Sequence, residues 1–378
     1  MDFNLTEDQE IMKEAIREFC LEYIEPIAAV LDEKSQFPHD VFSQLGEMGW
    51  LGMPVPMEYG GAGLDYLTYT VVLEEISRSC AAIALDIACH TGCAMVINNS
   101  GREEMKEALV PEMVKGKKIG AFCLTEPGAG SDASSIAATA VLEGLSYVIN
   151  GNKIFITNGP IADIYLVAAY TDKSKGGRGI SLFLVPHDTP GLKKGNHYTK
   201  MGLRASQTSE IILKDCCVPR GNLIGEEGQG LKIGLMALNH GRIAIAAQSV
   251  GLAQAAMDES VAYAKQRIQF GQPIATKQAI QWMLAEMALD ISAARLLAYK
   301  AATLKDQGQP FAIEAAMAKL FASQMANKHC YQALQIHGGL GYMKGIKVER
   351  LFRDVRATEI YEGTSEIQHM VIAQDLLA

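Results

Sequence analysis

The sequence lacks several patterns that identify common classes of protein. No apolar run approaches the roughly 20 residues of a membrane-spanning helix, and the N-terminus lacks the basic-then-apolar layout of a signal peptide. Lys and Arg number 34 against 43 Asp and Glu, which gives a formal net charge of -9. Polyanions are bound by clustered Lys and Arg, so this balance argues against a nucleic-acid-binding protein. We therefore expect a cytoplasmic protein with no nucleic-acid partner and no membrane insertion.

Metal-ligand spacing is also missing. Cys89 and Cys93 are four positions apart, and Cys216 and Cys217 are adjacent, so neither pair is a Cys-x-x-Cys clamp. Cysteines that stand alone in apolar surroundings are usually small core residues. No complete Gly-x-Gly-x-x-Gly follows a strand and opens a helix, and no Gly-x-x-x-x-Gly-Lys loop is present. We expect no metal site, and any nucleotide must be bound without a Rossmann or P-loop motif.

The chain changes character twice along its length. Its 378 residues exceed what one hydrophobic core usually organises. Residues 1–118 have the apolar spacing of helices, residues 119–225 contain short β-branched and aromatic runs, and residues 226–378 are helical again. The pattern predicts an α+β multidomain fold with an N-terminal helical domain, a small central β-barrel or sandwich, and a C-terminal four-helix bundle.

Local signals place several of these elements. Thr6 and Gln9 have the spacing of a capping box, which predicts a helix that starts here and ends at Pro26. Asn150-Gly151 lies between two strand-like runs and predicts a hairpin turn. Three long helices of the bundle are expected over Ile243–Gln266, Lys277–Lys305 and Phe311–Ile336.

Three segments carry residues suited to chemistry. Leu124–Asp132 combines hydroxyls with a Pro and two glycines, which suits either a loop that faces phosphate or carbonyl oxygens or a plain surface loop. Gln335–Tyr342 interrupts a long helix with three glycines. Glu362 lies on a loop before a final helix that Thr364 or Ser365 could cap. Taken alone, a carboxylate in such a loop is more often a solvated acid than a catalyst.

Together these segments resemble the acyl-CoA dehydrogenase family. Cys123–Asp132 resembles one family signature, Gln335–Tyr342 a second, and Tyr361-Glu362-Gly363-Thr364 the catalytic loop. The resemblance covers essentially the whole chain in the family's domain order. It implies an FAD enzyme that removes a proton and a hydride from neighbouring carbons of an acyl-CoA and passes electrons to electron-transferring flavoprotein.

The resemblance makes Glu362 the catalytic base. The α-proton of a thioester is weakly acidic, so a carboxylate must take it while hydrogen bonds stabilise the enolate oxygen. The backbone N–H of Glu362 is expected to be one such donor, and an apolar slot should raise the pKa of its carboxyl. Some relatives carry the base just before an Arg on a helix of the bundle. Here that position is Gly241, before Arg242, and it cannot act as a base.

The resemblance also assigns the ligand contacts. The expected FAD contacts are Thr125, Ser131, Phe155, Thr157, Arg267, Phe270, Gln335, Gly338, Gly339, Thr364 and Glu366. The expected contacts to the acyl-CoA are Ser131, Asn239, Arg242, Tyr361 and Gly363. Arg267 and Phe270 resemble a pair that reaches the FAD of a neighbouring subunit, although Arg267 alone could be a solvated helix end. A shared FAD site requires at least a dimer, and the family's usual homotetramer is expected.

The segment Ile87–Gly101 should line the acyl pocket. Its polar residues are Cys89, His90, Cys93, Asn98 and Asn99. They make the segment more polar than a slot for a long alkyl chain would be, so we expect a short, branched or cyclic acyl group. His90 could line the pocket or pack in the core. Other functions stay open, namely action on an unsaturated or cyclic acyl-CoA, the reductive direction on an enoyl-CoA, and a catalytically idle scaffold.

Overall fold

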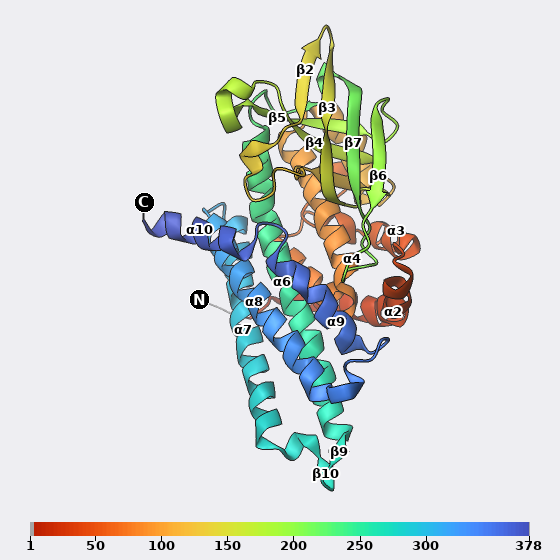
Figure 1. Ribbon diagram of the computed structural model, residues 1–378, viewed down its shortest axis with the longest axis vertical. Coiled ribbons are helices and arrows are strands. Elements are labelled where there is room, and N and C mark those ends of the chain that lie inside the picture. The colour runs from red at the N-terminus through yellow and green to blue at the C-terminus, as the bar shows by residue number, and fades with distance from the viewer. Residues whose placement is uncertain (1–3, 378) are drawn as a thin grey trace.

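Helices occupy both ends of the chain and strands its middle, which confirms the predicted order of a helical, a β and a second helical part. The computed structural model describes residues 4–377 (Figure 1). Its helices are α1 (Glu7–Phe19), α2 (Glu25–Lys34), α3 (His39–Glu47), α4 (Tyr66–Ser100), α5 (Glu103–Val114), α6 (Gly230–Gln266), α7 (Gln278–Asp306), α8 (Ala312–His337), α9 (Lys347–Val355) and α10 (Ser365–Leu376). Its strands are β1 (Gly120–Cys123), β2 (Thr139–Glu143), β3 (Ser146–Thr157), β4 (Ile164–Tyr170), β5 (Ile180–Pro186), β6 (Leu192–His197), β7 (Thr208–Pro219), β8 (Leu223–Ile224), β9 (Ile268–Gln269) and β10 (Gln272–Pro273).

The first helix starts at the predicted capping box. The Thr6 hydroxyl accepts from the Gln9 N–H at 3.3 Å, and the Gln9 side chain accepts from the Thr6 N–H at 3.0 Å. The predicted end at Pro26 is wrong, because the chain continues through a π-helical turn, Cys20–Ile24, into α2. Pro26 is the second residue of α2 and directly follows the π-helical turn, so its missing N–H falls where the helical hydrogen-bond pattern is already irregular.

Helix α4 is the longest element of the N-terminal part, with 35 residues. The Asp65 carboxylate caps it by accepting from the Thr68 N–H at 2.6 Å. By length and composition alone α4 could cross a membrane, but 72% of its most apolar window is buried inside the fold. Here α4 is a core helix that packs against α1, α5, α6 and β1.

Strands β1–β8 form one mixed sheet in the order β6-β7-β3-β2-β4-β5-β8, with β1 added parallel to β4, and β9 and β10 form a separate antiparallel pair. The hairpin predicted at Asn150-Gly151 is wrong, because both residues lie inside β3. The pairing with β7 shifts register between Ile149 and Gly151, where β7 advances by one residue more than β3. A Cβ on Gly151 would lie 2.4 Å from the Ala138 Cβ, so the glycine permits a close approach of two segments. The hairpin is formed instead by β2 and β3, where Glu143 pairs with Ser146.

The N-terminal and C-terminal helices share one hydrophobic core. Buried residues of α1, α4, α6, α7, α8 and α9 belong to a single cluster, so α4 completes the bundle that α6, α7 and α8 begin. A second cluster lies between the sheet, α4 and α5, and a third lies on the other side of the sheet. Figure 1 shows α4 and α6 running from the bundle up to the sheet. Where these two helices meet β1, the fold leaves a cavity.

Candidate active site

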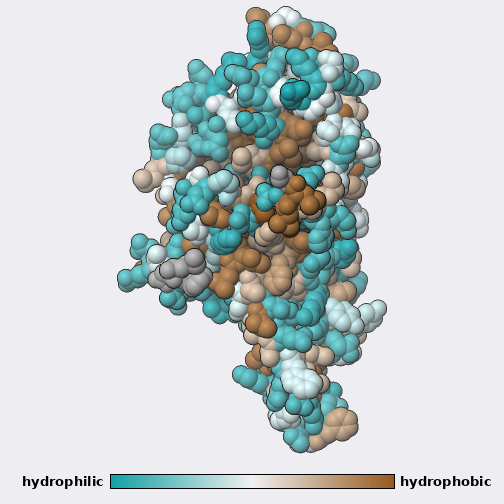
Figure 2. All heavy atoms as spheres, turned by 90° about the vertical axis from the view of Figure 1, so that its left-hand side faces the viewer, coloured by the Kyte–Doolittle hydropathy of each residue, from teal (hydrophilic) through white to brown (hydrophobic). Residues whose placement is uncertain are grey.

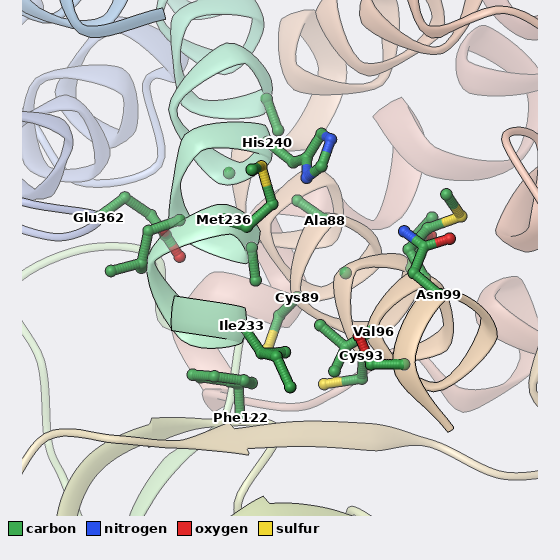
Figure 3. Close-up of a pocket in the computed structure, with 18 of the residues that line it drawn as sticks. Ala88, Cys89, Cys93, Val96, Asn99, Phe122, Ile233, Met236, His240 and Glu362 are labelled. Atoms are coloured by element: carbon green, nitrogen blue, oxygen red, sulfur yellow. The ribbon is translucent and has the colours of Figure 1, made fainter. Parts of the chain in front are cut away.

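A cavity of about 310 Å³ lies between α4 and α6, and Glu362 forms part of its wall. Figure 3 shows the Glu362 side chain reaching α6 from the loop before α10, with Phe122 of β1 on the side of the sheet. The other labelled lining residues are Ala88, Cys89, Cys93, Val96 and Asn99 from α4, and Ile233, Met236 and His240 from α6. The wall therefore mixes apolar groups with a few polar ones, as ligand pockets commonly do.

The loop that carries Glu362 has an unusual backbone. Glu362 and Gly363 both have positive φ, at 54° and 88°. A non-glycine residue in this region is strained, and such residues concentrate at functional sites. The loop then enters α10, where the Thr364 hydroxyl accepts from the Ile367 N–H at 3.4 Å. This cap confirms the predicted start of the final helix.

The electrostatic setting of Glu362 suits proton transfer near neutral pH. Burial raises the pKa of its carboxyl to about 7, while the positive charges of Arg242 and Lys319 oppose the rise. Its Oε2 atom is shielded from solvent and has no hydrogen-bond partner in residues 4–377. A carboxylate with a free oxygen and a pKa near 7 is matched to the work of a general base.

Gly241 leaves the space that the Glu362 carboxylate occupies. A Cβ placed on Gly241 would lie 2.5 Å from Oε2 and 2.9 Å from Cδ of Glu362. These distances are well inside van der Waals contact. The absence of a side chain at 241 therefore has a steric role, beyond the predicted absence of a second candidate base.

Arg242 and Asn239, both predicted to contact the acyl-CoA, are brought together on α6. An Arg242 Nη1–H donates to Asn239 Oδ1 at 2.8 Å. The Arg242 side chain is buried and its Nε has no partner in the described residues. Desolvation lowers the pKa of this guanidinium, and the nearby Glu362 partly restores it.

The loop that follows β1 is held by a buried ion pair. The Glu126 carboxylate lies 2.7 Å from Lys153 Nζ, and both side chains are almost fully buried. Glu126 also accepts from the Ala137 and Ala138 N–H groups, and Lys153 donates to the Leu124 carbonyl at 3.1 Å. These contacts fix the predicted ligand loop next to β3.

The residues predicted to face the flavin ring gather beside this loop. The Ile154 N–H donates to the Thr125 carbonyl at 2.9 Å, so Thr125 lies next to Phe155. Thr157 lies close to the cavity, because the Cys89 thiol donates to its carbonyl at 3.9 Å. The Phe155 ring is 61% exposed and lies 5.0 Å from the Tyr198 ring. Ser131 is exposed on the same loop.

A second group of predicted FAD contacts lies at the opposite end of the molecule. Arg267 and Phe270 occupy the β9–β10 tip at the bottom of Figure 1, and the Phe270 ring is 92% exposed. The stacking of the Tyr263 and His337 rings at 4.3 Å brings the end of α8 to the end of α6. Gln335, Gly338 and Gly339 therefore belong to this second group, along with Arg267 and Phe270. Within one chain, the structure does not bring the group to Thr125 and Thr157.

Two further predictions concern residues that do not line the cavity. The Tyr361 hydroxyl donates to the Gln248 side chain, and Tyr361 is not part of the cavity lining. The expected contact of Tyr361 with the substrate therefore stays a prediction. His90 is fully buried, with Nε2 2.9 Å from the Met113 carbonyl and Nδ1 accepting from the Gly120 N–H. Of the two alternatives left open by the sequence, His90 therefore packs in the core and does not line the pocket.

Two buried residues beneath the Glu362 loop were not singled out from the sequence. Lys319 of α8 donates to the Gly363 carbonyl at 2.7 Å, and Gln368 of α10 donates to the same oxygen at 2.9 Å. A signal for Lys319 was present in the sequence. It lies among Ala315, Ala316 and Ala322, and these spacings put it on an apolar helix face.

The acyl-CoA dehydrogenase N-terminal, middle and C-terminal domain families match residues 6–117, 121–216 and 228–377. The chain belongs to the acyl-CoA dehydrogenase family. It is 46% identical over 374 residues to the short-chain specific acyl-CoA dehydrogenase of Clostridium acetobutylicum, covering 99% of both chains. It is 44% identical over 379 residues to the acryloyl-CoA reductase (NADH) of Anaerotignum propionicum, covering all of this chain and 96% of the relative. The solved butyryl-CoA dehydrogenase of Megasphaera elsdenii superposes with a TM-score of 0.98 at 43% identity, over the full length of both chains.

This acyl-CoA dehydrogenase is therefore an FAD-dependent oxidoreductase. The residues present fit the cofactor. The exposed Phe155 ring beside Tyr198 offers an aromatic surface next to Thr125 and Thr157, which suits contact with a planar ring system. This surface adjoins the cavity that Glu362 lines.

Proposed function

We propose that this enzyme converts a short, branched or cyclic acyl-CoA to its 2,3-enoyl-CoA, with Glu362 as the base. The observation that supports this role is the Oε2 atom of Glu362, which lies at the cavity wall without a hydrogen-bond partner in the described residues. Its pKa of about 7 means that a large fraction is ionised at neutral pH. The atom is thus free to accept a proton from a substrate carbon.

Different groups at and around Glu362 abstract the proton, stabilise the thioester oxygen and contact the CoA portion. The carboxylate takes the α-proton, while the backbone N–H of Glu362, which donates to no group within residues 4–377, donates to the thioester oxygen. Bound FAD supplies the hydride acceptor. Arg242 and Asn239 contact the CoA portion, and the walls of α4 and α6 exclude water from the acyl group.

The polarity of α4 supports a substrate of modest size. Cys89, Thr91, Cys93, Asn99 and Ser100 all line the cavity, whereas a long alkyl chain is best matched by an uninterrupted apolar wall. The reductive direction on an enoyl-CoA is a second candidate, since the similar Anaerotignum propionicum protein is an acryloyl-CoA reductase. The same cavity and the same carboxylate would serve both directions.

The wide separation of the two groups of predicted FAD contacts supports assembly from several subunits. One copy supplies Thr125, Phe155 and Thr157, and the Arg267 tip of another copy completes the site. Figure 2 shows apolar surface across the face that carries α7 and α10. Exposed apolar side chains on these helices are Trp282, Leu289, Leu296, Met370 and Leu376, and such patches commonly mark subunit contacts. A homotetramer of three-domain subunits (1–118, 119–225 and 226–378), cytoplasmic and coupled to electron-transferring flavoprotein, is the assembly we propose.

The role of Glu362 is tested by anaerobic bleaching of the FAD absorbance. Glu362→Gln should keep FAD and bind acyl-CoA but lose bleaching with butyryl-, isobutyryl-, isovaleryl- and cyclohexanecarboxyl-CoA. Glu359→Gln is the matched control, since this carboxylate pairs with Arg356 at 2.6 Å and does not line the cavity. Near-normal bleaching by the Glu362 variant would place the base elsewhere. Reduction by long-chain esters alone would refute the proposed substrate size.

A further inference from the structure

A buried lysine of α8, Lys319, contacts the backbone of the Glu362 loop. The Lys319 side chain of α8 is 0% exposed, and its Nζ donates to the Gly363 carbonyl at 2.7 Å. No carboxylate of the described residues lies within 4.0 Å of this Nζ. The other fully buried lysine, Lys153, has Glu126 at 2.7 Å. Burial of an ammonium group without an ion pair is costly, so the position of Lys319 requires a compensating contact.

The Gly363 carbonyl and the loop it belongs to provide that contact. Gln368, also 0% exposed, donates to the same carbonyl at 2.9 Å and to the Glu362 carbonyl at 3.2 Å. Two helices, α8 and α10, thus hold two consecutive carbonyls of a loop in which Glu362 has a φ of 54°. A strained backbone of this kind persists only where its surroundings determine it. The three donated hydrogen bonds meet that requirement.

Lys319 is also one of two positive charges that act on the Glu362 carboxyl. Arg242 on α6 is the other, and both lower the pKa of Glu362. The remaining titratable neighbours, Tyr66 and Cys93 on α4 and Tyr361 on the same loop, have pKa values raised by burial or by their neighbours. They stay neutral near pH 7.

The charge of Lys319 responds in turn to this setting. Desolvation lowers its pKa to about 8, and Arg242 adds to the fall, while the carboxylates of Glu362, Glu359 and Glu366 oppose it. Near pH 7 the ammonium form therefore predominates.

We propose that Lys319 is a positioning residue, which holds the Glu362–Gly363 loop through the Gly363 carbonyl and favours the ionised form of Glu362. The inference rests on the proposed role of Glu362 as base. Lys319 touches neither the cavity nor the predicted flavin surface, so it acts through Glu362. The hydrogen bond helps to fix where the carboxylate lies, and the charge, together with that of Arg242, lowers the pKa that burial raises.

Two substitutions separate these contributions. Lys319→Gln keeps a hydrogen-bond donor and removes the charge, whereas Lys319→Met removes both. Lys328→Gln is the matched control on the same helix, because Lys328 is half-exposed and pairs with Asp290 at 3.1 Å on the protein surface. The carboxyl titration of Glu362 is followed in the holoenzyme by infrared difference spectroscopy, with the band assigned by its loss in Glu362→Gln. The pH profile of FAD bleaching is measured alongside.

In Lys319→Gln we expect the Glu362 titration to move up by about one pH unit. The rate of bleaching should fall about fivefold at pH 7 and recover by pH 9. A one-unit rise of the Glu362 pKa from about 7 lowers its ionised fraction at pH 7 from about a half to roughly a tenth. Lys319→Met should also lower the rate at high pH, because the loop is no longer held. An unchanged titration in Lys319→Gln, or an equal shift in Lys328→Gln, would overturn the inference. If no acyl-CoA bleached the FAD of the wild-type enzyme, the proposed function would be refuted instead. The infrared titration of Glu362 would still decide the role of Lys319.

Discussion

Substitution of Gly241 by alanine tests the steric relation between α6 and the Glu362 carboxylate. The added Cβ would lie 2.5 Å from Oε2, about 1 Å inside an ordinary contact. The obstructed atom is the end of a flexible side chain, so the carboxylate can move aside by rotation. The strain on the fold is therefore small, and the perturbation falls on the position of the base.

The expected magnitudes have opposite signs for stability and for rate. Alanine in the middle of a helix is favoured over glycine by about 0.5–1 kcal/mol, so Gly241→Ala should melt at or slightly above the wild-type temperature. A displacement of about 1 Å in a reacting group can cost up to roughly 100-fold in rate. We expect FAD bleaching by butyryl-CoA to slow by between about 10-fold and 100-fold, or ~1.4 to 2.7 kcal/mol in the barrier.

The assay is anaerobic stopped-flow bleaching of the FAD absorbance, with thermal melting of the same samples. Gly234→Ala is the matched control on α6, because its Cβ would meet only Phe122, at an ordinary 3.5 Å. This variant should gain the same helix stability and bleach at a near wild-type rate. A Gly241→Ala enzyme that bleaches within about threefold of wild type would show that the carboxylate does not act from the position seen here.

Three further outcomes follow from the same geometry. Glu362 ionises at about pH 7 in the fold against 4.5 in a free chain. The rate of FAD bleaching should therefore rise with pH around 7. The free energy of unfolding of the wild type should fall between pH 4.5 and 7, because ionised Glu362 is disfavoured in the fold. At pH 8, urea titrations should find Glu362→Gln more stable than the wild type by up to about 3 kcal/mol. Lys153→Met leaves the Glu126 carboxylate buried and unpaired, so we expect a loss of about 3–5 kcal/mol, reduced when Glu126→Gln is added. Arg267→Ala should release FAD on gel filtration, and mixing its subunits with Glu362→Gln subunits should restore bleaching if FAD sites are shared between chains.

Elements set by neighbouring residues were predicted well from the sequence. The helix expected over Lys277–Lys305 is observed as Gln278–Asp306, because an apolar period of 3.6 residues and its end signals are local features. Asn150-Gly151 has an equally strong local signal for a turn, yet it lies inside β3. That outcome depends on pairing with β7, which is distant in sequence, so tertiary contacts overrode the turn preference.

The candidate site divides in the same way. Glu362 could be identified because its loop carries a recognisable motif, and Gly241 because it lacks a side chain where a base could stand. Lys319 carries no motif. Its alanine neighbours place it on an apolar helix face, but a lysine within a helical pattern is normally solvated through its flexible stem. Its burial results from the loop that α10 places over α8, a relation between segments more than 40 residues apart, Lys319 and Gly363.

Two unfavourable features coincide at Glu362, and their coincidence is informative about function. The residue has a positive φ and a shielded oxygen atom without a partner, and each feature alone destabilises a fold. Glycine at 362 would relieve the strain, and a neutral apolar residue would remove the unpaired oxygen. The surrounding structure instead holds the loop with hydrogen bonds donated by Lys319 and Gln368. Local rules are broken here while they hold in the flanking helices, as expected where a fold has been shaped by a reaction rather than by stability.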